Sequence, residues 1–307
     1  MSGALSLRFS AQTQLTVGRI SRELSDLQRQ VASGLKADDL RSLGAAASQL
    51  LNAKSAKAAT DARSSAIDQL DARFGVQSLA LNQAASANSQ LAQAIRQAVS
   101  ADDGRGVNVE LEQGFSNLVS ALNQTWNGQP LFAGERQGVG PVRVKSLSEL
   151  LIAVTPDLLF DEAARQQVVD LGSGTPVALA DKASVLATDS FNTLRDLKTF
   201  IDAAGGAIGA PLTGVQRDQL LNIASRLEQA SNTLTNAEGR TGQVQKRLAS
   251  ESLVLRERSN LLIVEIGEQA DADLAQISVR LNSLLAQYEA TAKTFSDLSK
   301  LTLLDYL

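Results

Sequence analysis

Acidic residues are the side chains of this sequence with the clearest potential for chemistry. Asp102 and Asp103 precede Gly104, as at the start of a calcium-binding loop, but the alternating acidic ligands and the distal bidentate glutamate of such a loop are missing. We therefore predict a turn that breaks a helix. Asp271 and Asp273 could act as an acid and a base, yet residues two positions apart diverge on a helix and no apolar pocket is evident that would raise a pKa. We expect both carboxylates to be solvated.

The remaining catalytic and cofactor-binding patterns are absent from the sequence. Gly172-Ser173-Gly174 and Gly205-Gly206 are not followed by the Lys-Ser/Thr of a phosphate-binding loop and do not have the three-glycine dinucleotide spacing. The chain contains no histidine and no cysteine, which excludes zinc sites built on them, cysteine nucleophiles, disulfides and every Ser-His or Cys-His pair. We therefore expect no catalytic residue, no cofactor and no metal, and an enzyme is the weakest functional class.

Composition and charge exclude further classes of protein. The chain has 307 residues, of which 44% are hydrophobic but only 4% aromatic, a low share for a globular enzyme whose pocket depends on large rings. The formal charge of −4, without any cluster of Lys and Arg free of acids, argues against nucleic acid as a partner. No apolar run approaches the ~18 residues that span a bilayer, and the first residues do not have the pattern of a cleaved signal peptide. We expect no membrane insertion.

Prolines divide the chain into two helical arms and a middle. All five lie between Pro130 and Pro211, and a helix interior tolerates proline poorly. Residues 1–129 and 212–307 are therefore free to form long helices. Further elements are predicted within this frame: a short helix over residues 109–127, extended structure over 131–145, a hairpin from 167–170 and 175–180, and a helix over 185–204. The predicted fold class is mainly α, an elongated helical bundle or coiled coil with a small β-containing central insertion.

Three windows repeat apolar residues at alternating spacings of three and four, the pattern of a narrow helical seam. The central window has Ile67, Leu70, Phe74, Leu81, Ala84, Leu91, Ile95 and Ala98, with Gln77 and Asn88 at two seam positions. The first window has Val17, Ile20, Leu24, Leu27 and Val31, and the last has Ala270, Leu274, Ile277, Leu281, Leu284, Tyr288, Phe295 and Leu298, with Thr291 in the vacant slot. The central seam is expected to close a bundle within the chain.

The two terminal seams call for a different interpretation. Their other faces are polar, and one narrow seam does not offset the ~1–2 kcal/mol of backbone entropy lost per ordered residue. We expect the terminal helices to pair with each other and still to require a neighbouring subunit. The candidate subunit-packing residues are Val17, Ile20, Leu24, Leu27, Val31, Leu274, Ile277, Leu281, Leu284 and Tyr288.

Five short motifs, in order along the chain, resemble those of the bacterial flagellin superfamily and, within it, of the hook-associated junction proteins. They are Ser33-Gly34-Leu35-Lys36 with Asp38-Asp39, Leu131-Phe132-Ala133-Gly134, Glu238-Gly239-Arg240 through Gly242 to Arg247-Leu248, Asp271-Ala272-Asp273-Leu274-Ala275, and Leu303-Leu304-Asp305-Tyr306-Leu307. No single motif is specific, but the resemblance extends over nearly the whole chain.

The resemblance implies a layered fold. Residues 1–42 with 265–307 would form a terminal coiled-coil layer, residues 43–140 with 187–264 a helical arm, and residues 141–186 a small outer insertion. It also implies an extracellular structural subunit of the flagellum, exported through the flagellar type III apparatus with a chaperone and without a cleaved signal peptide. Its partners would be a ring of identical subunits, the other hook-associated junction protein and filament flagellin. Filament flagellin itself is the alternative, and a signalling coiled-coil module is a further one from a different class.

Overall fold

The computed structural model describes residues 2–37, 39, 41, 43–44, 46–170 and 176–304, without the side chains of residues 2–11, 13 and 297–304. The chain divides into two compact units. Met1–Ala62 with Leu255–Leu307 form what we call the terminal unit, and Arg63–Val254 form the middle unit. The predicted division into three layers at other boundaries stays a prediction.

Helices dominate the described part of the chain, with two small antiparallel sheets between them. The helices are α1 (Ser2–Ser33), α2 (Ala46–Ser100), α3 (Val107–Leu122), α4 (Leu147–Ile152), α5 (Pro156–Leu159), α6 (Ala183–Ala203), α7 (Gly214–Ala270) and α8 (Leu274–Leu304). The sheets pair β1 (Thr125–Trp126) with β2 (Gln129–Pro130), and β3 (Val168–Asp170) with β4 (Pro176–Ala178). The prediction of a mainly α fold with a small β-containing middle is confirmed. Within the described residues, no helix is long and apolar enough to cross a membrane.

The middle unit is built on the antiparallel packing of α2 against α7. Contacts between the two helices pair Arg63 with Glu251, Gln77 with Thr241, and Arg96 with Glu228, so the residue numbers rise along one helix as they fall along the other. The central seam of the sequence faces this packing, because Ile67, Phe74, Leu81, Ala84, Leu91 and Ile95 are all buried. The prediction of a bundle within the chain is therefore confirmed for this window.

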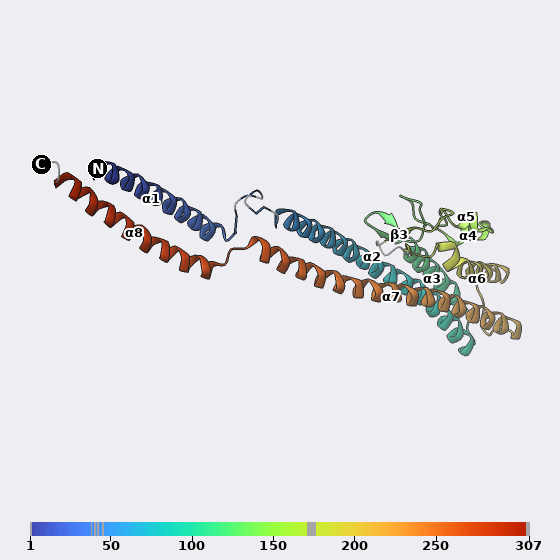
Figure 1. The fold of residues 1–307 in the computed structure, drawn as a ribbon. Helices are drawn as coiled ribbons and strands as arrows, with labels where there is room; N and C mark the ends of the chain where they lie inside the picture. The colour runs from blue at the N-terminus through green and yellow to red at the C-terminus, as the bar shows by residue number, and fades with distance from the viewer. Residues whose placement is uncertain are drawn as a thin grey trace. The chain divides into compact units, whose positions relative to one another are not determined.

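Shorter elements cover one end of the α2–α7 pair (Figure 1). Helix α6 packs against both α3 and α4, and its fully buried Phe191 lies edge-to-face with Phe115 of α3 and Phe160, with ring centroids 6.3 and 5.6 Å apart. Three of the few aromatic rings in this chain are therefore concentrated in the core around Phe191. The second polar seam residue, Asn88, is satisfied there, since its Nδ2 donates to Ser190 Oγ at 2.8 Å.

Two predicted elements differ in the structure, and two short helices are additional. Helix α3 ends at Leu122 and not near residue 127, because Asn127 and Gly128 have φ values of +50° and +76° and form the turn between β1 and β2. Residues 131–145 form turns with one isolated bridge, from Val142 to Phe160, and not extended structure. Helices α4 and α5 were not predicted. The predicted hairpin at 167–180 and the helix at 185–204 are confirmed as β3–β4 and α6. Gly172-Ser173-Gly174 lies outside the described residues.

Candidate assembly interface on the terminal helix pair

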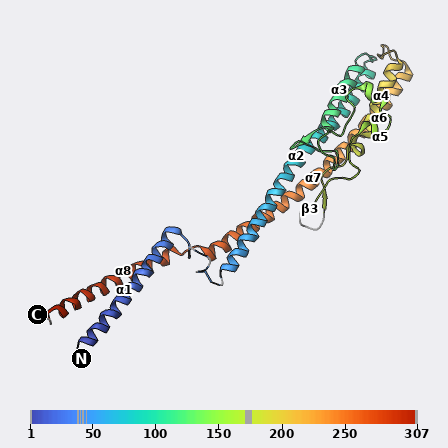
Figure 2. The same cartoon turned by 90° about the horizontal axis from the view of Figure 1, so that it is seen from above.

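Helices α1 and α8 lie side by side in opposite directions and form the described core of the terminal unit at the chain ends (Figures 1 and 2). This core contains Ile20 and Leu27 of α1, and Ile277 and Leu284 of α8, each 4–8% exposed. Both pairs are seven residues apart, the spacing that returns a side chain to the same face after two helical turns. Leu24 and Leu281 are partly buried against this core. Each helix therefore contributes a single narrow row of apolar side chains to the contact.

A short connection at the end of α1 holds the two helices in register. Gly34 has a φ of +71°, a conformation that glycine adopts at little cost when it ends a helix. Its carbonyl accepts from Ala272 N at 2.9 Å, and Lys36 N donates to Ala270 O at 2.8 Å. The Lys36 ammonium also donates to the Glu268 carbonyl. The Ser-Gly-Leu-Lys motif thus has a structural role, which is to join the end of α1 to the gap before α8.

Asp273 caps the first turn of α8. Its Oδ1 accepts from the backbone N–H groups of Ala275 and Gln276, both at 3.0 Å, and a carboxylate in this position satisfies donors that have no partner inside the helix. Asp271 instead bridges to Leu35 through its backbone. The two carboxylates are exposed, as expected from the sequence. The predicted seam needs one correction, since Ala270 is the last residue of α7 and not part of the final helix.

Several apolar side chains of the helix pair are only partly covered by the described residues. Among the predicted subunit-packing residues, Val31 is 46%, Leu274 50% and Tyr288 38% exposed, whereas Val17 is half-buried. Leu285, which the seam pattern did not include, is 38% exposed. Leu274 and Leu285 are eleven residues apart, about three turns of helix, and therefore lie on one flank of α8 beside the seam.

A second uncovered apolar group lies on α7 within the terminal unit. Leu261, Ile263 and Val264 are 66%, 50% and 59% exposed. This stretch of α7 contacts α2 through Ser259 Oγ, which donates to Asp61 at 2.7 Å, and Lys57 Nζ donates to the same carboxylate from within α2 at 2.6 Å. These two hydrogen bonds, Lys57 first, lower the pKa of Asp61. Leu261 and Val264, three residues apart, share one side of the helix, whereas Ile263 lies on another.

An ion pair joins the two terminal helices and contributes little to their stability. Arg280 Nη2 lies 2.5 Å from Glu23 Oε1 across the two helices, with side chains 65% and 35% exposed. Exposed ion pairs contribute only ~0–1 kcal/mol. Within the described residues, no group of three or more potential ligands could hold a metal ion. The terminal helix pair is therefore suited to association with other proteins through apolar contacts.

The structure brings the predicted residues together within one chain. Ile20, Leu24, Leu27, Ile277, Leu281 and Leu284 meet in the intramolecular seam, while Val31, Leu274 and Tyr288 stay exposed beside it. Their role in packing between subunits stays a prediction. Asp38 and the final Asp305-Tyr306-Leu307 lie outside the described residues.

Comparison with known proteins gives similarity at the level of the fold. No family model and no curated protein matches the sequence. A solved structure titled as a flagellar hook-associated protein of Vibrio parahaemolyticus aligns with a TM-score of 0.57 and 15% identity, covering 75% of this chain and 98% of that one. FlgL of Bacillus cereus aligns with a TM-score of 0.51 and 14% identity, covering 66% of this chain and 98% of that one. The chain therefore has the fold of these two proteins.

Proposed function

We propose that the chain is a structural subunit of the bacterial flagellum that joins hook to filament. The observation that carries this proposal is the terminal helix pair, in which only four of the described side chains, those of residues 12 and 14–33 in α1 and 274–296 in α8, form a buried apolar core. Such a pair gains most of its stability from further burial, because ordering the backbone is the main cost of folding. The fold shared with two flagellar proteins supports the same conclusion.

In the proposed mechanism, neighbouring copies cover one another's exposed apolar groups. The flank formed by Leu274 and Leu285 of one subunit packs against a different surface of the next, a heterologous contact that generates a ring when the rotation closes. The ring then meets the other hook-associated junction protein and filament flagellin. Export through the flagellar type III apparatus with a chaperone is part of this proposal, since terminal segments that order only on assembly suit passage through a narrow channel.

The substitution Leu281→Asp tests the proposed role of the terminal pair. Leu281 is partly buried beside Ile277 and Leu284, so a carboxylate there would be desolvated without a partner and would separate the helices. The middle unit does not contain this residue and should keep its thermal melting transition. We expect self-association, measured by sedimentation of the full chain, to be lost, and swimming to be lost in the source bacterium that carries only this variant.

Asn282→Asp is the matched control, because it adds the same charge at the next position of α8, where the side chain is exposed. It should assemble and swim as the unaltered chain does. Normal swimming with Leu281→Asp would contradict the proposal. Growth of the purified chain into long filaments after seeding would instead indicate a filament subunit, and a stable dimer with protected termini would indicate a signalling module.

A further inference from the structure

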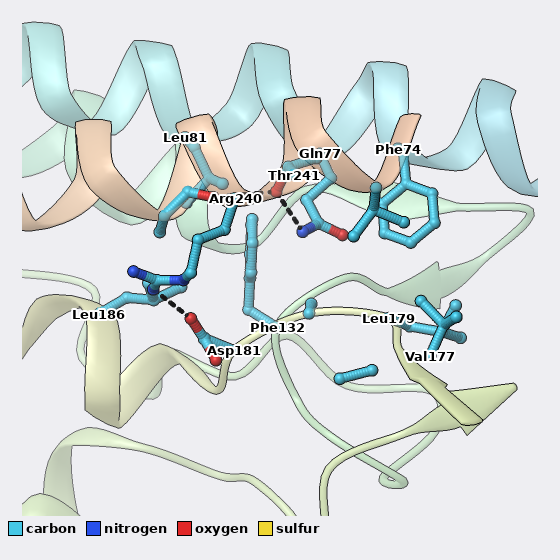
Figure 3. A pocket seen from close by; sticks show the side chains of 14 residues that line it. Phe74, Gln77, Leu81, Phe132, Val177, Leu179, Asp181, Leu186, Arg240 and Thr241 are labelled. Atoms are coloured by element: carbon cyan, nitrogen blue, oxygen red, sulfur yellow. Dashed lines mark hydrogen bonds and ion pairs between the residues drawn. The ribbon is translucent and has the colours of Figure 1, made fainter. Parts of the chain in front are cut away.

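A cavity of about 240 Å³ lies in the middle unit between α2, α7 and the segment that follows β4 (Figure 3). Phe74 and Leu81 of α2, Phe132, and Leu186 of α6 contribute buried apolar walls, each at most 3% exposed. Leu179, also buried, lines the side formed by the β4 segment. The volume is smaller than the roughly 300–1,000 Å³ of pockets that hold drug-sized ligands. The space therefore suits a molecule of about one ring.

One polar atom without a partner belongs to a residue that lines this cavity. Gln77 is 3% exposed, and its Nε2 donates to Thr241 Oγ1 at 3.0 Å, but its Oε1 is buried and has no hydrogen-bond partner. Figure 3 shows this oxygen turned away from Thr241, on the side of Phe74. Asn88, the other polar residue of the same seam, has its Ser190 partner inside the fold. Of the two polar residues in this seam, Gln77 is therefore the one with an unpaired buried acceptor, its Oε1.

The orientation of the Gln77 amide follows from its neighbour. The Thr241 hydroxyl donates its single hydrogen to the Ala237 carbonyl at 3.1 Å, so it can only accept from Gln77. The amide nitrogen must then face Thr241, which leaves the oxygen as the group without a partner. A buried acceptor of this kind is costly unless a donor reaches it.

An ion pair closes one edge of the cavity. Arg240 Nη2 lies 2.6 Å from Asp181 Oδ2, and the other oxygen of Asp181 accepts from Gln166 Nε2 at 2.9 Å. The pair joins α7 to the segment that follows β4 and neutralises both charges. A charged ligand would find no unpaired countercharge on these two groups, so the cavity favours a neutral one.

We propose that this cavity binds a small, neutral ring compound carrying one O–H or N–H donor, which donates to Gln77 Oε1. The ring fills the apolar space, since an apolar cavity of about 150 Å³ already binds benzene and this one is larger. The donor supplies the hydrogen bond that Gln77 Oε1 lacks among the described residues. The site is independent of the terminal helices, so its failure and the failure of the assembly proposal are separate results.

Phenol and toluene form the matched pair of probes, because they have nearly the same size and only phenol has a donor. We expect titration of the full chain to shift the methyl NMR signals of Leu179 and Leu81 with both compounds, and phenol to bind roughly tenfold more tightly. Gln77→Leu should remove or reverse this preference. Gln83→Leu, on the exposed side of the same helix, should leave it unchanged.

Thr241→Val gives a second readout that does not alter the proposed contact atom. It removes the acceptor that orients the Gln77 amide, and we expect the preference for phenol to fall while toluene binding persists. Equal affinity of the unaltered chain for the two probes would overturn the role of Gln77. Absence of methyl shifts at Leu179 and Leu81 with both probes, up to their solubility limits, would overturn the site.

Discussion

At the scale of single residues, the acidic turn after α2 illustrates how a candidate site becomes a structural element. The Arg105 guanidinium hydrogen-bonds the Asp103 carboxylate and lowers its pKa to about 2, so Asp103 stays ionised and is unsuited to acid catalysis near neutral pH. Asp102 Oδ1 accepts from Leu212 N at 2.8 Å. The turn thus joins the end of α2 to the segment before α7. The sequence predicted the turn, but not this long-range contact, because local chemistry does not encode which distant segment will lie beside it.

Gly104 is required in this turn because another segment approaches it closely. A Cβ at this position would lie 2.8 Å from Ile208 Cβ, a distance that forces one of the two backbones to move. We expect Gly104→Ala to lower the free energy of unfolding of the middle unit by about 1–3 kcal/mol, the usual cost of overpacking. Urea denaturation followed by the signal of Trp126 measures this change.

Gly106→Ala is the control for that substitution. A Cβ there meets nothing within 4 Å, and the residue has a φ of −82°, which alanine adopts without strain. Its free energy of unfolding should stay within about 0.5 kcal/mol of the unaltered chain. An equal loss for both variants would show that close approach to Ile208 is not the reason for glycine at position 104.

At the scale of elements, helix ends explain where prediction from sequence succeeded and where it failed. The apolar period of α2 extends over many turns, and such a long signal identified its buried face correctly. The end of α3 was misplaced although Asn127-Gly128 is a strong signal for a two-residue hairpin. The strands on either side have two residues each, too few for an alternating pattern. Helices α4 and α5 are shorter than the window over which a helical period can be recognised.

The cap of α8 gives a prediction at this scale. Asp273→Ala removes the acceptor of two first-turn N–H groups and should destabilise the start of α8 by about 1 kcal/mol, with a range of 0.5–2 kcal/mol. The measurement is hydrogen exchange of the first-turn amides of α8 in the full chain. Asp273→Asn keeps a capping oxygen and should retain most of the protection. Equal exchange in the three proteins would contradict the capping role.

At the scale of the whole molecule, the two units differ in the size of the apolar cores that their described residues form. The middle unit has one large core that includes Phe191, Leu118 and Leu227, each at most 1% exposed. The terminal unit leaves Leu261, Val264 and Leu274 at least half exposed. The sequence predicted the pairing of the terminal helices because their seams have matching periods. It could not identify the flank of α8 beside that seam, because exposure within one chain depends on what the fold leaves uncovered.

Hydrogen exchange of the full chain, first dilute and then assembled, shows whether the terminal helices require a neighbouring subunit to become stable. We expect that in the dilute monomer the amides of residues 14–33 and 276–296 exchange at least about tenfold faster than those of residues 80–95 in α2, because the core that the structure describes between α1 and α8 has four side chains. On assembly these amides should become protected. Terminal helices that are already as protected in the dilute monomer as residues 80–95 would show that they do not need a neighbouring subunit and would contradict the proposed assembly.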